Sequence, residues 1–317
     1  MKRSVREIYS DVLREVRKAV VAQDEVFSLI FTALITGGHV LLEDSPGTGK
    51  TLLAKSFAKS FAGDFKRVQF TPDLLPQDIT GLNIYDQKKG EFSLMKGPVF
   101  TNVLLADEIN RATPRTQSSL LEAMEEHQVT IDGVTMPLEE PFLVIATQNP
   151  IETIGTYPLP EAELDRFLIK LSMGHLGETG ELEILKRYAN DDPSEEVGSV
   201  VTSDDMKAAK DEVRGVYVHE CVMKYIVSIA DALKGTPEVV YGISPRASLA
   251  LLHLSQSFAA ISGRGFVTPD DVRYLAPYVL SHRLELRSGL SDSEVTKELV
   301  KDVVKKVDVP VEDFGKK

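Results

Sequence analysis

Short apolar runs alternate with helical patterns through the first half of the chain, which is how a parallel sheet covered by helices is encoded. The β-rich runs are separated by stretches with helical apolar spacing. They predict five strands, at residues 39–42, 65–70, 102–106, 142–147 and 167–173. The pattern therefore favours an α/β core built on a parallel sheet.

Two segments depart from this rhythm, because apolar and polar residues alternate in them around a tight turn. One covers residues 83–97 around a Lys-Lys-Gly turn, and the other covers 127–140 around Asp132-Gly133. Asp-Gly between alternating apolar residues is a strong hairpin signal. We expect both segments to be β-hairpins inserted into the core.

The second half of the chain has a helical pattern. Residues 244–261 and 268–284 each open on a capping residue followed by proline, a typical helix start, and the clearest loop is "ANDDPSEEVGS" at 189–199. At 317 residues the chain also exceeds the usual size of one core. We expect an α/β domain over 1–175 and an all-helical domain over 176–317.

Composition narrows the function classes. The chain has 36 Lys+Arg against 48 Asp+Glu, a net charge of −12, which argues against a broad basic surface for nucleic-acid phosphates. The single cysteine, Cys221, lies in an apolar-periodic stretch, which predicts a buried and inert thiol. No apolar run reaches the roughly 18 residues of a membrane span. The N-terminus is charged and amphipathic, unlike a secretory signal, so we expect a soluble cytoplasmic protein.

The stretch "LLEDSPGTGKTL", at 41–52, fits a phosphate-binding loop with one change. Against the pattern G-x-x-x-x-G-K-[ST], Gly49, Lys50 and Thr51 match, whereas Asp44 replaces the first glycine. A predicted strand precedes the loop and a helical run follows it. Loop N–H groups would bind phosphate oxygens, Lys50 would neutralise the outer phosphates, and the Thr51 hydroxyl would coordinate Mg²⁺. The predicted contact residues are Pro46, Gly47, Thr48, Gly49, Lys50, Thr51 and Leu52.

Polar residues follow two other predicted strands. "VLLADEINRA" ends on two carboxylates, where Asp107 would hold Mg²⁺ and Glu108 would polarise the attacking water as general base. "FLVIATQNP" ends on Asn149, an amide suited to holding water or a γ-phosphate oxygen. The spacing equally fits a turn-forming asparagine before proline.

Two arginines are further candidates. Arg166 precedes the last predicted strand, and Arg246 lies in the first turn of a predicted helix. Exposed arginines are usually solvated or in minor ion pairs, but either could instead stabilise the charge on a transferring phosphoryl group.

Together these residues resemble the AAA+ ATPases and, within them, the MoxR family. The stretches that carry the similarity, from about residue 5 to about residue 290, are "GPVFTNVLLADEINRATPRTQSSLLEAMEEHQVTIDG", "VQFTPDLLPQDITG", "ATQNPIETIGTYPLPEAELDRF", "SPRASLALL" and "FVTPDDVRYLAPYVLSHRL". The resemblance implies a five-stranded P-loop core with a helical lid, ATP and Mg²⁺ as ligands, and a hexameric ring with nucleotide between subunits.

The resemblance also implies residue roles. Asn149 would be the sensor 1 residue, Arg166 the arginine finger reaching the neighbour's site, and Arg246 the sensor 2 arginine of the lid. The two hairpins would be the helix 2 insert and the pre-sensor 1 insert, which face the pore or a partner. Gln69 and Thr71 lie near the position of a polar residue that restrains the catalytic glutamate.

The adenine would lie against "VVAQDEV", where Val21 is a predicted contact and Ala22 replaces the family's usual glycine. A methyl group at that position should perturb the fit modestly.

The family is associated with chaperone-like remodelling or activation of partner proteins, metal-cofactor insertion among them, often with a separate von Willebrand factor A domain partner. We therefore expect an ATPase motor. One alternative is a nucleotide-gated scaffold whose hydrolysis is slowed by Asp44. Another is a helicase-like DNA motor, since minichromosome-maintenance helicases carry the same hairpins and Lys88 and Lys89 lie at a predicted tip. The acidic balance makes nucleic acid the less favoured partner.

Asp44 separates the first two hypotheses. A carboxylate about 8 Å from a phosphate charge would repel it by roughly 2 kcal/mol at an effective dielectric near 20. Asp also adopts positive φ less readily than Gly. The first loop position lies where the strand ends, before the phosphate-binding amides, so we expect the side chain to turn away toward solvent or a local N–H or cationic partner.

Overall fold

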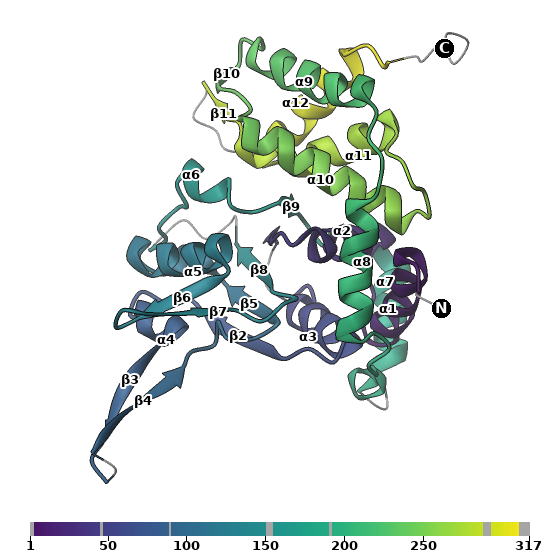
Figure 1. The fold of residues 1–317 in the computed structure, drawn as a ribbon. Helices are drawn as coiled ribbons and strands as arrows, with labels where there is room; N and C mark the ends of the chain where they lie inside the picture. Colours follow the sequence, from purple (N-terminus) through teal and green to yellow (C-terminus); the bar gives the residue numbers. More distant parts are fainter. Residues whose placement is uncertain are drawn as a thin grey trace.

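The computed structural model describes residues 3–44, 47–88, 90–149, 155–189, 192–287 and 293–310. A five-stranded parallel sheet forms the centre, in the order β2-β5-β8-β1-β9 (Figure 1). The strands are β2 Phe65–Gln69, β5 Val103–Asp107, β8 Leu143–Gln148, β1 Val40–Glu43 and β9 Ile169–Leu171. The five predicted strands and the α/β fold class are confirmed.

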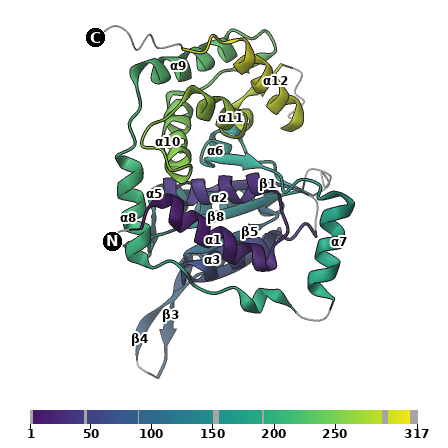
Figure 2. The same cartoon turned by 90° about the vertical axis from the view of Figure 1, so that its right-hand side faces the viewer.

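Both faces of this sheet are covered, which explains why its central strands β5, β8 and β1 are largely apolar, whereas the edge strand β2 carries Lys66, Arg67 and Gln69. Val40 and Leu42 of β1 pack in one core with helices α1 Val5–Ala19, α2 Asp24–Thr36 and α3 Lys50–Ser60. Leu41, between them, points to the opposite core, which contains α5 Pro114–Glu126. Figure 2 shows α1, α2 and α3 in front of the strands.

Both predicted hairpins are present. The first consists of β3 Gly81–Asp86 and β4 Glu91–Lys96, follows the short helix α4 Pro76–Thr80, and projects away from the body (Figure 1). The second consists of β6 Gln128–Ile131 and β7 Val134–Pro137. In its turn, Asp132 (φ 49°) and Gly133 (φ 80°) adopt the positive φ that a two-residue hairpin turn favours. Asn83 Nδ2 donates to Asp132 Oδ2 at 2.8 Å, which joins the two hairpins.

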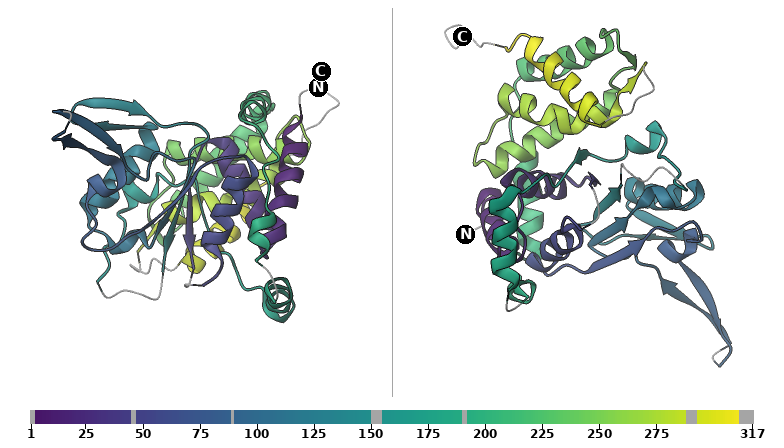
Figure 3. Two further views of the ribbon diagram at one scale, coloured as in Figure 1. Left: turned by 90° about the horizontal axis from the view of Figure 1, so that it is seen from below. Right: turned by 180° about the vertical axis from the view of Figure 1, so that it is seen from behind.

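The C-terminal region is helical, and its helices lie above the core (Figure 3). Ser244 and Thr268 cap two of them, each accepting from a backbone N–H three residues on, as predicted. The elements are α9 Glu220–Lys234, α10 Pro245–Ile261, α11 Pro269–Leu280, η3 Ser281–Arg283 and α12 Ser293–Lys306.

This region also contains a small antiparallel sheet, β10 Val239–Tyr241 with β11 Glu285–Leu286, where only helices were expected. Its strands are too short to show a period of two.

The C-terminal helical region is here called the lid. Three elements connect the sheet to it, namely α7 Gly177–Tyr188, η2 Pro193–Glu196 and α8 Ser203–Arg214. η2 lies within the segment expected to be a loop. Tyr188 Oη donates to Ala19 O at 3.1 Å, and α8 packs against α1 and α2, so both helices lie beside the N-terminal helices. The domain division at residue 175 stays a prediction.

Two smaller expectations concern the surface. Cys221 is half-buried at the start of α9, not fully buried as predicted, because it lies on the flank of the helix. Over the described part of the chain, no helix combines the length and apolar character needed to cross a membrane.

Candidate functional site

A cavity of about 410 Å³, here called the loop cavity, lies where the glycine-rich loop meets the segment between α1 and α2. It brings together predicted nucleotide contacts that are far apart in sequence, which are Val21, Gly47, Thr48, Gly49 and Leu52. Pro46, also predicted, lies outside the described residues. Ala22 is half-buried against the core and does not line this cavity. The cavity is within the usual size range of small-ligand sites.

The far wall of the loop cavity was not anticipated from the sequence. Met173 to Leu176, after β9, and Glu181, Ile184 and Tyr188, on α7, form it. These residues belong to no phosphate-loop motif and lie more than a hundred positions beyond the loop, so only the packing of α7 on the N-terminal segment reveals them.

The described part of the loop has the backbone conformation that anion binding needs. Gly47 and Gly49 adopt φ values of 85° and 86°, which favour glycine. Gly49 caps α3, so Lys50 and Thr51 are its first two residues and their N–H groups lie at a helix N-terminus. Lys50 Nζ donates to the Asp44 carbonyl oxygen at 3.0 Å.

The Asp44 side chain turns away from the loop, as expected. Its Oδ2 accepts from Met173 N at 2.6 Å, and its Oδ1 accepts from Ser172 Oγ at 2.7 Å. The residue is buried and is not among the described non-glycine residues with positive φ. The conformational cost considered for Asp44 therefore does not apply, and its carboxylate is held by two donors outside the loop.

Asp107 and Glu108 lie at the carboxyl end of β5 and share a buried threonine. Thr147 Oγ1, on the neighbouring strand β8, donates to Asp107 Oδ1 at 2.7 Å and accepts from Glu108 N at 2.8 Å. Arg67, on β2 at the other side, donates from Nη2 to Asp107 Oδ2 at 2.6 Å. Thr147 and Arg67 carry no signal in the sequence, because their roles arise from strand adjacency.

Glu108 is held by two side chains. Gln69 Nε2 donates to Glu108 Oε2 at 2.7 Å, and Arg111 Nη1 donates to the same oxygen at 2.9 Å. The contact with Gln69 agrees with the restraining role that the family resemblance implies, whereas Thr71, the other candidate, bonds to Asp73 instead. Glu108 also has φ 56° and ψ 50°, an unfavourable conformation for glutamate, and such strain concentrates at functional sites.

The donor set suits Mg²⁺. Mg²⁺ binds oxygen and usually keeps several waters, so it takes only one or two protein carboxylates. Asp107, 15% exposed at its side chain, offers a carboxylate, and Thr51 offers a hydroxyl in the first turn of α3. Asp107 would exchange its Arg67 contact for the metal.

Asn149 lies just beyond β8 and is buried. The preceding residue, Gln148, pairs in register with Glu43, and its carbonyl accepts from Asp44 N at 3.2 Å. Asn149 is therefore at the same sheet edge as the glycine-rich loop, where a sensor 1 residue would need to be.

Arg166 and Arg246 come together, but not at the loop cavity. Both pair with Glu125, Arg166 through Nε at 3.1 Å and Arg246 through Nη1 at 2.9 Å. Glu125 follows Met124, whose carbonyl contacts the His39 ring at 3.0 Å, and His39 directly precedes β1. These groups are therefore near the amino edge of the sheet, whereas the loop follows the carboxyl end of β1, about 13 Å along the strand.

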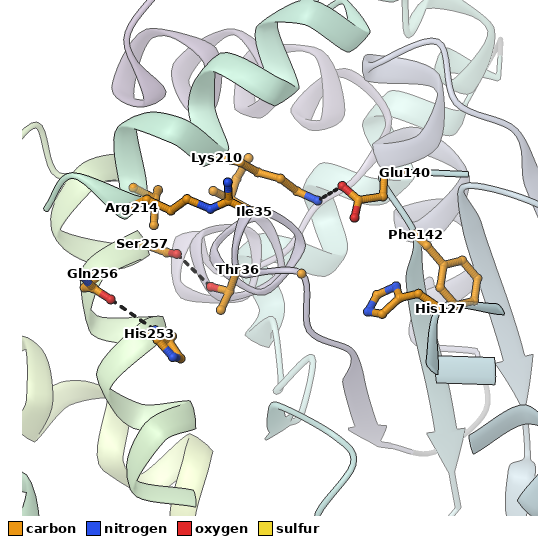
Figure 4. Close-up of a pocket in the computed structure, with 12 residues that line it drawn as sticks. Ile35, Thr36, His127, Glu140, Phe142, Lys210, Arg214, His253, Gln256 and Ser257 are labelled. Atoms are coloured by element: carbon orange, nitrogen blue, oxygen red, sulfur yellow. Dashed lines mark hydrogen bonds and ion pairs between the residues drawn. The ribbon is translucent and has the colours of Figure 1, made fainter. Parts of the chain in front are cut away.

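A second cavity, of about 360 Å³, lies between the core, α8 and the lid (Figure 4). Lys210 of α8 pairs with Glu140 at 2.5 Å, and Thr36 of α2 donates to Ser257 of α10 at 2.8 Å. These contacts hold α8 and the lid against the core. None of the predicted site residues lines this cavity.

A parallel sheet with a glycine loop after one strand, an Asp-Glu pair after another and a helical lid defines a P-loop protein of the AAA class. Comparison agrees. The model of the ATPase family associated with various cellular activities matches residues 39–169, and the AAA lid domain model matches 235–303.

Comparison with individual relatives identifies the family within this class. The uncharacterised protein YeaC of Bacillus subtilis is 46% identical, covering 95% of this chain and 94% of its own length. Chaperone MoxR1 of Mycobacterium tuberculosis is 42% identical, covering 90% and 78%. A crystal structure of a candidate ATPase from Cytophaga hutchinsonii has a TM-score of 0.88 and 39% identity, covering 97% and 96%. The chain therefore belongs to the MoxR family of AAA ATPases.

Proposed function

We propose that this protein hydrolyses ATP and uses the energy to remodel or activate a partner protein. The observation that carries the proposal is the arrangement at the carboxyl edge of the sheet, where the loop with Lys50, the Asp107–Glu108 pair and Asn149 all follow neighbouring strands. This is the edge at which open parallel sheets bind ligands.

Each residue then has a definite task. Lys50 leaves the Asp44 carbonyl to bind phosphate oxygens, together with loop N–H groups. Glu108 takes a proton from the water that attacks the γ-phosphorus, while the bond to the bridging oxygen breaks and leaves ADP and phosphate. Asn149 orients that water. Bound Mg²⁺, held by Thr51 and Asp107, would neutralise charge on the outer phosphates.

We propose further that Arg166 and Arg246 serve the nucleotide of an adjacent subunit in a hexameric ring. Their position near the amino edge, paired to Glu125, supports this assignment, because the loop of the same chain is at the other edge. Head-to-tail contacts that close into a ring place one subunit's arginines against the next subunit's loop.

The first hairpin supports a protein partner. Tyr85 and Phe92 are 52% and 73% exposed, and their rings contact each other at a tilt, with centroids 5.2 Å apart. Exposed apolar residues gathered on a projecting element mark an interaction site. The partner is a separate chain, and a von Willebrand factor A domain protein is the candidate that the family suggests. The M. tuberculosis relative is named as a chaperone, which is consistent with this role.

The scaffold alternative loses its main support, because Asp44 bonds to Ser172 and Met173 and not toward the loop. For the DNA motor, Lys88 lies exposed in the turn of the first hairpin, whereas Lys89 is outside the described residues, and the net charge of −12 still disfavours nucleic acid.

The function is tested by steady-state phosphate release with and without Mg²⁺, using wild type and Lys50→Ala. We expect Mg²⁺-dependent turnover only in the wild type. Capture of partners with a Glu108→Gln variant, which should bind ATP without releasing phosphate, would then identify the substrate. Background turnover by wild-type rings at saturating ATP would overturn the proposal.

A further inference from the structure

Glu125 is the point where the core and lid arginines meet. Its Oε2 faces Arg166 Nε at 3.1 Å and its Oε1 faces Arg246 Nη1 at 2.9 Å. Arg166 belongs to the segment before β9, and Arg246 to the first turn of α10 in the lid. One carboxylate thus fixes the relative position of two guanidinium groups that come from different parts of the chain.

The nitrogen through which each arginine contacts Glu125 determines how its guanidinium group is oriented. A guanidinium carries five N–H donors in a rigid planar fork. Glu125 contacts Arg166 at Nε and Arg246 at Nη1, so each ion pair constrains the orientation of one guanidinium plane. Arg246 Nε also lies 3.7 Å from Asp165 Oδ2. The pairing therefore sets how both groups are oriented.

A second ion pair, between Arg283 and Asp165, lies beside this cluster. Arg283, on η3 and 4% exposed at its side chain, donates to Asp165 Oδ1 at 2.6 Å. By contrast, the Glu125 side chain is 35% exposed and Arg246 is 48% exposed. Arg283 is thus the buried member of the cluster, while Glu125 holds the more exposed Arg166 and Arg246. Three arginines thus face two carboxylates in this cluster.

Glu125 is also linked to the catalytic edge of its own chain. It lies near the end of α5, and α5 begins shortly after Glu108 and Arg111. A helix of this length spans about 20 Å. α5 therefore runs from the region just after Glu108 to the carboxylate that holds the two arginines.

We propose that Glu125 is a positioning residue that aligns Arg166 and Arg246 for the phosphates bound by the neighbouring subunit. The inference rests on the proposed function, since it requires hydrolysis between subunits. Because the groups are distant from the loop cavity, Glu125 should affect turnover rather than the binding of ATP to its own chain.

The test compares wild type, Glu125→Gln, Glu125→Asp and a matched control, Glu122→Gln, which removes an equal charge from the same helix. We expect kcat to fall at least tenfold in Glu125→Gln with KM within twofold, a partial recovery in Glu125→Asp, and no change in Glu122→Gln. Unchanged or raised kcat in Glu125→Gln would overturn the inference, whereas an inactive wild type would overturn the proposed function itself.

An experiment with mixed variant subunits distinguishes a loss of arginine positioning from damage to the fold. Glu125→Gln keeps a working loop, and Lys50→Ala keeps correctly held arginines. When the two variants are co-expressed in equal amounts, roughly a quarter of the interfaces in a head-to-tail ring combine a working loop with a neighbour whose arginines are correctly held. We expect the mixture to exceed the sum of the two separate rates several-fold. A mixture no faster than that sum would contradict the proposal.

Discussion

Asp44 and Met173 are joined by a 2.6 Å hydrogen bond, in which the backbone N–H of Met173 donates to the Asp44 carboxylate. This bond ties the strand before the glycine-rich loop to the segment after β9 that lines the loop cavity. Asp44 therefore has a structural task that the usual glycine could not perform.

Replacing Asp44 tests that task. Asp44→Ala leaves the Met173 N–H and the Ser172 hydroxyl without their acceptor, so the free energy of unfolding should fall by about 1–3 kcal/mol. Asp44→Asn keeps an acceptor oxygen of the same shape and should lose less. Urea denaturation measures both, and equal stability of Asp44→Ala and wild type would contradict the assignment.

The same site distinguishes the motor from the scaffold. Because the carboxylate points away from the loop, Asp44→Gly should not increase ATP turnover. Steady-state kinetics at saturating ATP decide this, and a tenfold gain in kcat would restore the scaffold hypothesis.

Gln69 should hold Glu108 in a resting position, since its amide donates to the carboxylate at 2.7 Å. In Gln69→Ala this restraint is lost, and we expect the partner-free rate of ATP hydrolysis to rise a few-fold. Thr71→Ala is the matched control, because Thr71 bonds to Asp73 and not to Glu108. A similar rate change in both variants would show that the effect is not specific to the restraint.

His39 should make stability depend on pH. Complete burial lowers its pKa from 6.5 to about 4, and the ring bonds to the backbone at Met124 and Val144. The unfolded chain takes up a proton near pH 6.5 that the folded chain refuses, so stability falls as the pH drops from 6.5 toward 4, by up to about 3 kcal/mol.

Thermal melting between pH 7 and pH 5 measures this dependence. His282 is also buried with a lowered pKa, so the informative comparison is between His39→Gln, His282→Gln and wild type. His39→Gln should flatten the slope in part. A slope identical to wild type in that variant would show that His39 does not contribute.

The first hairpin should be needed for the partner but not for the chemistry. Replacing Tyr85 and Phe92 by serine removes exposed rings that lie outside both cores. We expect unchanged melting and basal ATPase activity, with loss of partner capture by the Glu108→Gln variant. Retained capture would place the partner elsewhere on the surface.

The strands and hairpins could be read from the sequence because each carries a strong local signal. Buried parallel strands appear as continuous apolar runs, and Asp132-Gly133 encodes its own turn. The loop, Asp107 and Glu108 were likewise identified from motifs that keep a fixed spacing.

Residues whose role depends on the spatial neighbour of a strand or helix could not be read in this way. Thr147 and Arg67 reach Asp107 from the strands on either side, and Tyr188 reaches the loop cavity because α7 folds back on the N-terminal segment. Glu125 is similar, since nothing near it in sequence indicates that Arg166 and Arg246 converge on it.

The most direct test of the account is ATP turnover by wild type and Glu108→Gln under identical conditions, with nucleotide binding measured in parallel. General-base catalysis contributes roughly 10²–10⁴-fold, so we predict a kcat at least a hundredfold lower in Glu108→Gln with ATP still bound. Equal rates in the two proteins, with ATP bound by both, would contradict the claim that this edge of the sheet is a hydrolytic site.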